Sequence, residues 1–330
     1  MTDRGVRPLA IALGVQVLLG AALIVWASQS FPLPGALSGD DERTTPARTS
    51  AIIAPAPAPA PAALAPRATV DRFDGTRAFA LLREQVRRYG WRPAGSPALR
   101  RLAVRLRGML PRGRLEPIAG HPGLRNVVGS IPGRNPAILV AAHYDVEATP
   151  EGFVGANDGA AGTAAVVWIA RALKRAPRVR GQRAVRFALF DGEEEPAGCQ
   201  PFLACGLRGS TAYAKRHGSS VHSMVLLDYV AEKRGLSFPR EAGSDRELWQ
   251  RLRAAARRVG VGALFPDATT GQILDDHTPF TQRGIPAIDI IDFDYPPRDT
   301  LADNLDKVSE RSLDAVGEAV LELLRDLRRR

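Results

Sequence analysis

Four short apolar runs in the later part of the chain set its secondary-structure pattern. They are "AILVAA" (residues 137–142), "VRFALF" (185–190), "MVLLD" (224–228) and "PAIDII" (286–291). Each has the length and the partly β-branched composition of a buried strand. Helical patterns such as residues 160–175 lie between them. This alternation predicts an α/β fold with a mostly parallel mixed sheet and helices on both faces.

Polar residues follow each predicted strand at once. The sequences after the four runs are "HYD", "DGEEE", "DYV" and "DFDYPPRD". The carboxyl ends of parallel strands meet at one edge of a sheet, and ligand sites of open α/β folds form there. The four segments therefore predict a single crevice lined by one imidazole and several carboxylates.

The N-terminal part has a different pattern. Residues 9–28 carry no charge and are largely apolar, and Arg4 and Arg7 precede them. This length is close to the ~20 residues that span a bilayer, which favours an uncleaved anchor over a cleaved signal. We therefore expect a membrane segment over residues 1–30, a Pro/Ala-rich linker over 31–67 and one folded domain over 68–330. The charge pattern places that domain outside the cytoplasm, or in the medium if the segment is cleaved.

Composition adds limits to this interpretation. The 330 residues are 45% hydrophobic, and the formal net charge is +10. Arg residues are spread among Asp and Glu without an aromatic-interleaved basic patch, so a solvated basic surface is favoured over a nucleic-acid site.

Three segments carry the candidate chemistry. His143 and Asp145 project from the same strand face, as in a metal ligand with an orienting carboxylate, although a structural histidine fits equally. Asp158 precedes an apolar helix and suits either a helix cap or a ligand. Glu193 and Glu194 follow a buried strand, where crowded like charges are unfavourable unless a cation or shared proton offsets them. A solvated loop is the alternative there.

The ordered motifs "HYD", "GANDGAAGTA", "FDGEEE", "VLLDYV", "DDHTPF" and "LDKVS" resemble the co-catalytic zinc aminopeptidases of metallopeptidase family twenty-eight. That family includes the glutaminyl cyclases, and the resemblance runs from about residue 76 to the end of the chain. It implies that Glu193 is the general base and acid, that Asp145 orients a ligand and that His277 lines the pocket. It also implies that Asp158 bridges two zinc ions, and that the ligands are His143, Asp158, Glu194 and Asp228.

One position departs from the family pattern. The family has a histidine ligand in a segment similar to "YPYWHT", where this chain has "YPPRDT". Asp299 thus replaces the histidine and Arg298 an aromatic residue. Asp299 is a substitute ligand, or the site keeps one metal, or the protein is a pseudoenzyme. The resulting set of one His and four carboxylates would shift the preference from Zn towards Mn or Mg. We expect Asp303 and Asp306, further along, to be ordinary turn residues.

A second departure is the insertion at residues 196–205, "PAGCQPFLAC", which resembles the longer connection of glutaminyl cyclases. It contains both cysteines of the chain, Cys199 and Cys205. In an oxidising compartment we expect a local disulfide between them. The other histidines, His121, His217 and His222, are assigned to surface or structural positions.

These observations predict a zinc-dependent aminopeptidase that hydrolyses N-terminal peptide bonds with metal-activated water and a Glu base. The alternatives are a glutaminyl-peptide cyclotransferase that forms N-terminal pyroglutamate, and a peptide-binding pseudoenzyme. The expected partners are peptide or protein N-termini and, through residues 1–30, a membrane. We expect no nucleic acid, and a monomeric domain.

Overall fold

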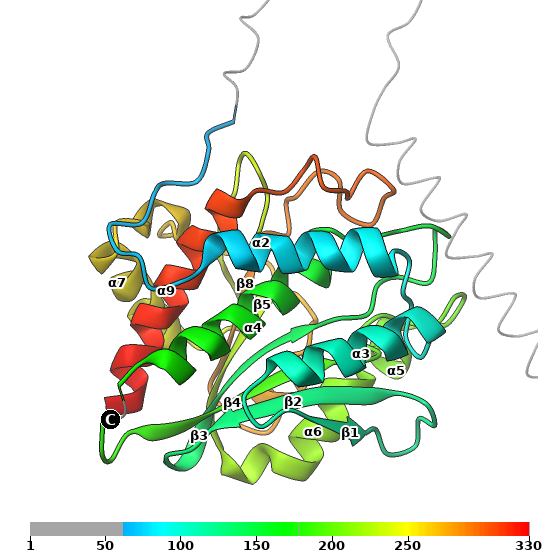
Figure 1. Cartoon of the computed structure of the whole chain (residues 1–330), viewed down its shortest axis with the longest axis horizontal. Helices are drawn as coiled ribbons and strands as arrows, with labels where there is room; N and C mark the ends of the chain where they lie inside the picture. The colour runs from blue at the N-terminus through cyan, green and yellow to red at the C-terminus, as the bar shows by residue number, and fades with distance from the viewer. Residues whose placement is uncertain (1–61, 178, 330) are drawn as a thin grey trace, which may run out of the picture. The chain divides into compact units, whose positions relative to one another are not determined.

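The computed structural model describes residues 62–177 and 179–329 (Figure 1), and these form one compact unit. The predicted membrane segment (1–30) and most of the predicted linker lie outside the described residues. Residues 62–67 of that linker are described and already contact the domain, because the Gly235 N–H donates to the Ala63 carbonyl at 3.0 Å. Within the described ranges, no helix combines the length and apolar character needed to cross a membrane.

The central sheet has six strands in the order β1-β2-β4-β3-β5-β8. β3, β4, β5 and β8 run parallel, whereas β1 and β2 pair antiparallel at one edge. The strands are β1 (Arg114–Pro117), β2 (Arg125–Ile131), β3 (Arg134–His143), β4 (Arg183–Phe190), β5 (Val221–Asp228) and β8 (Ala287–Ile291). A separate parallel pair consists of β6 (Arg240–Glu241) and β7 (Thr269–Thr270). The four predicted strands are confirmed, and the two antiparallel strands are additional.

Helices cover both faces of this sheet, as predicted. The α-helices are α2 (Gly75–Glu84), α3 (Pro97–Met109), α4 (Ala160–Arg175), α5 (Phe202–Cys205), α6 (Arg208–His217), α7 (Arg246–Arg258), α8 (Thr278–Thr281) and α9 (Glu310–Arg329). Short turns of other helix types are η1 (Gln85–Tyr89), η2 (Gly218–Ser220) and η3 (Gly262–Leu264). α4 lies next to α2 and α9 on one face (Figure 1).

The sheet divides the hydrophobic core into two layers, one on each face. Ile138 and Val140 of β3 belong to the larger cluster, with residues of α2, α3, α4, α7 and α9. Leu139 belongs to the smaller cluster on the other face, with Tyr213 of α6 and Phe280 of α8. Alternate side chains of one strand thus face opposite helical layers, as the period of two in a strand requires.

The approach of α4 to the sheet depends on a glycine. A Cβ at Gly162 would lie 2.2 Å from the Leu227 carbonyl oxygen of β5, so only glycine fits at this contact. The helix N-terminus is thereby held against the carboxyl ends of β3 and β5. This packing places the loop before α4 beside the residues that follow these strands.

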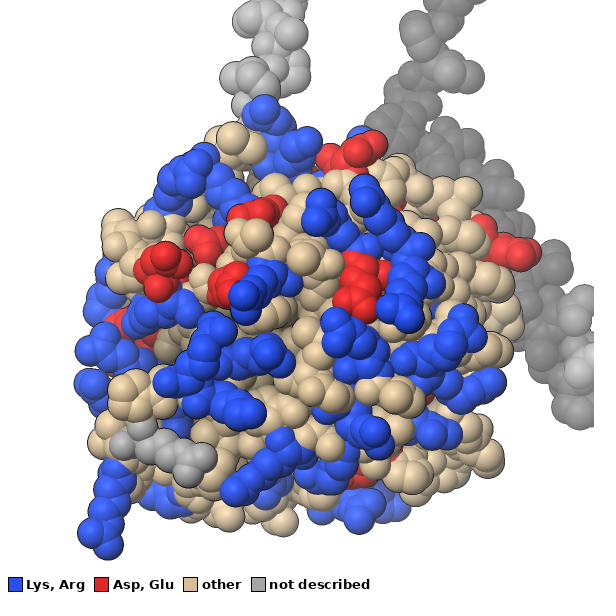
Figure 2. All heavy atoms as spheres, in the orientation of Figure 1, with Lys and Arg blue, Asp and Glu red and all other residues tan. Residues whose placement is uncertain are grey.

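Charged side chains are distributed unevenly over the surface. α2, η1, α3 and α4 contain eleven Lys and Arg residues but a single acidic residue, Glu84. Figure 2 shows that Lys and Arg greatly outnumber Asp and Glu on the face that these helices form, with uncharged surface between them. The acidic residues that matter for the site lie instead at the carboxyl ends of the strands and in the loops that follow them.

Candidate metal centre

His143 is the centre of a group of buried side chains at the carboxyl edge of the sheet. It is the last residue of β3, and Asp228 is the last residue of β5, which pairs with β3 in parallel. The His143 Nε2 atom lies 3.2 Å from Asp158 Oδ1 and 3.3 Å from Asp228 Oδ1. All three side chains are buried. The structure therefore brings together three of the four ligands that the resemblance implied.

Asp158 reaches this position because the loop before α4 is held from several sides. The backbone N–H groups of Asn157 and Asp158 both donate to the Asp303 carboxylate, at 2.9 and 3.0 Å. Gly159 follows with φ of +68°, and a Cβ there would lie 2.4 Å from the Asp145 carbonyl oxygen. The Asp158 side chain does not cap the helix. Its Oδ2 atom accepts a hydrogen bond from the Tyr229 hydroxyl at 2.9 Å.

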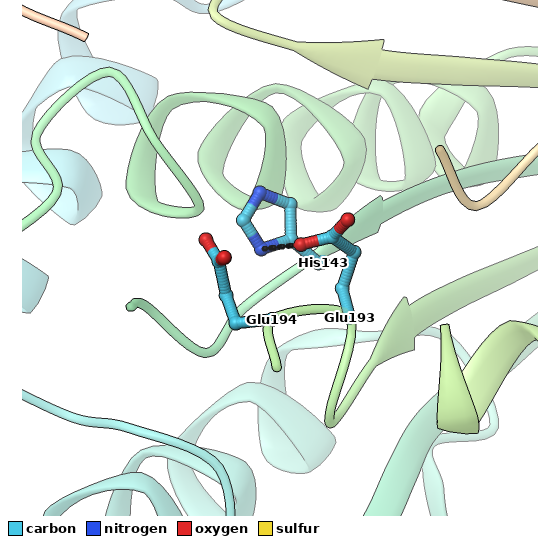
Figure 3. Close-up of side chains that lie close together, drawn as sticks. All are labelled: His143, Glu193 and Glu194. Atoms are coloured by element: carbon cyan, nitrogen blue, oxygen red, sulfur yellow. Dashed lines mark ion pairs between the residues drawn. The ribbon is translucent and has the colours of Figure 1, made fainter. Parts of the chain in front are cut away.

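Glu193 and Glu194 approach the imidazole from the loop after β4 (Figure 3). Glu193 Oε2 lies 3.8 Å from His143 Nδ1. His143, Glu193 and Glu194 form one group of three ligand atoms within 4.8 Å of one another, and His143, Asp158 and Asp228 form a second such group. The triple-carboxylate loop is thus part of the buried site, and its first two glutamates are not solvated surface residues.

Asp145 holds this glutamate loop. Its carboxylate accepts hydrogen bonds from the backbone N–H groups of Gly192, Glu193 and Glu194 at 3.0 to 3.4 Å. Asp145 Oδ1 also lies 3.7 Å from His143 Nδ1, a longer contact than a hydrogen bond. Asp145 therefore acts mainly on the glutamate loop, whereas the resemblance implied a role on the imidazole.

Asp299 stands apart from both three-residue groups. Its side chain is 42% exposed and its backbone adopts φ of +60°. Its Oδ2 atom accepts a hydrogen bond from Arg298 at 2.8 Å, and its Oδ1 atom accepts one from the Tyr229 hydroxyl at 3.1 Å. The structure thus places Asp299 at the rim of the site, where it is engaged by a cation and a phenol.

Burial perturbs the acidity of the central residues. Burial raises the pKa of Asp228 to about 7, although the His143 side chain opposes the shift. Burial also raises the pKa of Glu193 and of Glu194, and the negative charge of Asp158 adds to the shift of Glu194. The pKa of His143 is lowered by burial but raised more strongly by Asp145, Asp158 and Asp228, with a net increase. Such shifts indicate carboxylates crowded together without a compensating cation.

A metal ion fits this arrangement. Among the described residues, no hydrogen-bond donor satisfies Asp158 Oδ1, and none pairs with His143 Nδ1. Buried polar atoms in proteins are nearly always paired. Unpaired atoms next to further carboxylates are therefore expected where a metal ion would bind. Imidazole nitrogen and carboxylate oxygen are both ligands that zinc binds, and the share of carboxylates also suits Mn or Mg.

A pocket of about 230 Å³ opens over this group. His143, Asp158, Glu193, Glu194 and Asp228 all line it. Its apolar wall is formed by Phe202, Ile273, Leu274 and Phe293. Phe202 belongs to the insertion that contains the cysteines, and Cys199 and Cys205 form the expected disulfide. The insertion therefore contributes directly to the pocket.

Sequence reasoning missed two residues that support the site. Tyr229 joins Asp158 to Asp299 through its hydroxyl. Arg92 is fully buried and donates to the carbonyls of Tyr144 and Val154, at 3.2 and 2.6 Å. Burial lowers the pKa of Arg92 to about 10, against the opposing charges of Asp158 and neighbouring carboxylates. Tyr229 had a local signal, because it directly follows a predicted ligand, whereas nothing near Arg92 indicated its role.

Asp303 corrects a further expectation. It was predicted to be an ordinary turn residue, but it is fully buried and accepts the two loop N–H bonds described above. Asp306 is exposed, in agreement with a turn position. His277 is buried, with its Nε2 atom 3.2 Å from Glu241 Oε1, and is not among the residues that line the pocket. His217 has a structural contact with Glu116 at 2.7 Å.

A buried imidazole among carboxylates, at the carboxyl ends of parallel strands, defines an α/β protein with a candidate metal centre. The chain belongs to peptidase family M28, whose family model matches residues 126–324. The resemblance inferred from the motifs is therefore confirmed. The relatives of this chain include both aminopeptidases and glutaminyl cyclases.

Two curated relatives illustrate this range. The chain is 27% identical over 198 residues to the aminopeptidase YwaD of Bacillus subtilis, a match that covers 56% of this chain and 39% of that protein. It is 30% identical over 215 residues to a glutaminyl-peptide cyclotransferase-like protein of Mus musculus, with 54% of this chain and 55% of that protein covered. The matches thus span about half of these relatives or less.

The solved structures that resemble this chain include a glutaminyl cyclase and an exopeptidase. A glutaminyl cyclase of Porphyromonas gingivalis is 28% identical, with a TM-score of 0.68. A Zn-dependent exopeptidase of Parabacteroides distasonis is 26% identical, with a TM-score of 0.67. Each match covers 78% of this chain and 99% of the solved one.

Proposed function

We propose that this chain is a zinc-dependent aminopeptidase that hydrolyses the first peptide bond of peptides or proteins. The observation that supports the proposal best is the position of His143 Nε2, within 3.3 Å of carboxylate oxygens of both Asp158 and Asp228, with Glu193 on the other side of the ring. His143, Asp158 and Asp228 would hold the ion, with Glu194 beside them. Zinc in such a site polarises a carbonyl group and lowers the pKa of water.

The residues of the chain then have separate roles. The Glu193 carboxylate would accept a proton from the attacking water and return it to the amine nitrogen of the leaving peptide. Asp145 would keep Glu193 in place through its backbone N–H bonds. The apolar wall of the pocket would receive the first side chain and exclude bulk water from it. Several acidic groups near the pocket would favour a protonated substrate α-amine.

A glutaminyl-peptide cyclotransferase is the second candidate. The insertion over residues 196–205 favours it, since its disulfide holds a loop that supplies Phe202 to the pocket. In this reaction the α-amine of an N-terminal Gln attacks its own side-chain amide carbon. Glu193 would take the proton from the amine and deliver it to the departing ammonia. Water is then not the nucleophile.

One experiment separates these candidates. The full chain is loaded with Zn, incubated with a Gln-initiated peptide and a Leu-initiated peptide, and the products are weighed by mass spectrometry. Release of the first residue from either peptide supports the aminopeptidase. Loss of one ammonia from the Gln peptide without shortening would contradict the aminopeptidase proposal and support the cyclase.

A matched pair of variants tests the role of Glu193. Glu193→Gln should lower kcat by about 10²–10⁴-fold because it removes the proton acceptor. Glu151→Gln changes an exposed carboxylate that lies outside the pocket, and should leave kcat nearly unchanged. Metal binding without turnover of either peptide in the unaltered protein would point to the third candidate, a peptide-binding pseudoenzyme.

The cellular context belongs to the same proposal. The uncharged apolar stretch of residues 9–28 would anchor the chain in a membrane, with the catalytic domain outside the cytoplasm. The domain would work as a monomer on peptide or protein N-termini. Fractionation of cells that express the full chain, with protease added to intact cells or spheroplasts, tests the anchor and its orientation. Recovery in the soluble cytoplasmic fraction would contradict both.

A further inference from the structure

Tyr229 is held firmly at the edge of the site. It follows Asp228 at the end of β5 and adopts φ of +47°, a conformation that is costly for a bulky residue. Its side chain is buried, and its ring lies 5.8 Å from that of Tyr295. Its hydroxyl lies 2.9 Å from Asp158 Oδ2 and 3.1 Å from Asp299 Oδ1. A strained backbone and a packed ring thus fix one hydroxyl between two carboxylates.

We propose that the Tyr229 hydroxyl takes the place of a second metal ion, so that this chain binds a single ion at His143, Asp158 and Asp228. The inference rests on the proposed metal-dependent function, and it specifies how many ions the site holds and where. It assigns to Tyr229 a positioning role, because the hydroxyl acts through the carboxylates that it contacts.

The two oxygens of Asp158 have different surroundings. Oδ1 faces His143 Nε2 at 3.2 Å, and in the described part of the chain no hydrogen bond reaches it. Oδ2 points the other way and accepts the Tyr229 hydroxyl. A carboxylate that bridges two ions offers one oxygen to each. Here the Tyr229 hydroxyl lies against Oδ2, so the side of Asp158 that is open to an ion is that of Oδ1, facing His143.

Asp299 is engaged on both of its oxygens. Oδ1 shares the single proton of the Tyr229 hydroxyl with Asp158 Oδ2, and Oδ2 accepts a hydrogen bond from Arg298 at 2.8 Å. The Arg298 guanidinium also lies 4.0 Å from the centre of the Phe293 ring, which holds it over the rim of the pocket. A fixed positive charge next to a carboxylate opposes the binding of a cation there. Asp299 is therefore a poor replacement for a metal-binding histidine.

The Tyr229 hydroxyl and a second metal ion would compete for the same position between Asp158 and Asp299. Zinc lies about 2.0–2.2 Å from carboxylate oxygens. An ion that reached both Asp158 Oδ2 and Asp299 Oδ1 would have to enter the space between these oxygens, where the Tyr229 hydroxyl oxygen lies 2.9 and 3.1 Å from them. It would have to displace a hydroxyl whose ring is packed against Tyr295. Asp299 in place of the histidine and the tyrosine at position 229 are thus both explained by the absence of a second metal ion from this position.

The glutamate pair does not offer an independent second site. Its three-residue group contains the same imidazole, His143, as the group of Asp158 and Asp228. A neutral imidazole presents one lone pair to a metal, because its other nitrogen carries the proton. Binding at Nε2 leaves Nδ1 protonated near Glu193 and Asp145. The two groups therefore share a ligand that serves only one ion at a time.

Metal stoichiometry tests this inference without an activity assay. The full chain is saturated with Zn, freed of excess metal, and measured by native mass spectrometry and by elemental analysis. We expect one ion per chain. Two ions in the unaltered protein would overturn the inference but leave the proposed function intact. No bound ion would overturn both.

Variants identify Tyr229 as the cause. Asp299→His alone should still bind one ion, because the hydroxyl remains in place. The double variant Tyr229→Leu with Asp299→His should bind two. Tyr295→Phe removes a neighbouring buried hydroxyl that donates to Asp303, and it should keep one ion. A double variant with a native-like near-UV circular dichroism spectrum and still one ion would contradict the role of Tyr229.

Discussion

At the scale of single residues, the site depends on buried carboxylates that bind backbone N–H groups. Asp145 holds the glutamate loop, and Asp303 holds the loop of Asp158. Neither carboxylate has to touch a substrate for its loss to matter. A buried acceptor that satisfies several donors is costly to remove, because the donors are left unpaired in a low-dielectric environment.

Asp303→Ala tests this view. The substitution leaves the N–H groups of Asn157 and Asp158 and the Tyr295 hydroxyl without their acceptor. We expect the free energy of unfolding to fall by about 3 kcal/mol, and the affinity for Zn to fall as well. Urea unfolding and zinc titration measure the two effects. The exposed Asp306→Ala should change stability by no more than about 0.5 kcal/mol. Equal effects of the two variants would refute the role assigned to Asp303.

The residues that could be predicted from sequence share one property. His143, Glu193 and Asp228 directly follow or end predicted strands, so the topology of a parallel sheet brings them together. Arg92 and Asp303 contact the site across long stretches of chain, 62 residues for Arg92 with Val154 and 146 for Asp303 with Asn157. No local pattern encodes such contacts, and an acidic residue in a turn gives the same sequence signal whether it is buried or exposed.

At the scale of elements, the sheet was predictable where its strands are apolar on both faces. β4, β5 and β8 are largely buried, as is β3 after its first three residues, and continuous apolar runs reveal them. β1 contains Arg114 and Glu116 and is partly exposed, and β2 begins with Arg125 and Asn126. β1 at the edge and β2 beside it carry too few consecutive apolar residues to stand out from loops.

The insertion with α5 is the element most specific to this pocket. Its disulfide closes a short loop, and loop-closure entropy gives such a crosslink about 2 kcal/mol. We expect the double variant Cys199→Ser with Cys205→Ser to lose up to this amount of stability and to show a raised KM, because Phe202 would no longer be fixed in the wall. The measurements are thermal unfolding and steady-state kinetics on the peptide that proves to be the substrate.

Two comparisons sharpen that experiment. The unaltered protein treated with a reductant should match the double variant in KM, since both lack the same bond. Leu203→Ser, next to Phe202 but exposed and outside the pocket, should keep the original KM. If the double variant lost stability without any change in KM, the insertion would be a structural brace with no part in substrate binding.

At the scale of the whole molecule, charges of opposite sign are separated. The formal net charge of the chain is +10, and a large excess of cations lies on the layer of α2, η1, α3 and α4. The carboxyl edge of the sheet instead concentrates buried acids whose pKa values are raised. Without a bound cation, the folded state must keep these acids protonated or tolerate their repulsion, so metal binding and folding are coupled.

The sign of the resulting pH dependence follows from the direction of these shifts. Asp228 has a pKa of about 7 in the folded protein and an ordinary value of 3.8, so the folded state binds more protons between these values. Glu193, Glu194 and His143 are shifted in the same direction. The free energy of unfolding of the metal-free protein should therefore fall as pH rises from about 4 through 7. A bound ion keeps the carboxylates ionised and removes this loss.

Thermal unfolding in EDTA and in Zn, from pH 5 to pH 8, measures this coupling. At a free Zn concentration 100 times Kd the ion should add about 2.7 kcal/mol, or roughly 5–10 °C in Tm for a domain of this size. The difference between the two conditions should grow with pH. Contributions from groups outside the site cancel in that difference. Asp228→Asn should reduce both the Zn effect and its slope with pH, whereas Asp306→Asn should alter neither. A Zn effect that stayed constant over this pH range would show that the buried carboxylates are not what the ion stabilises.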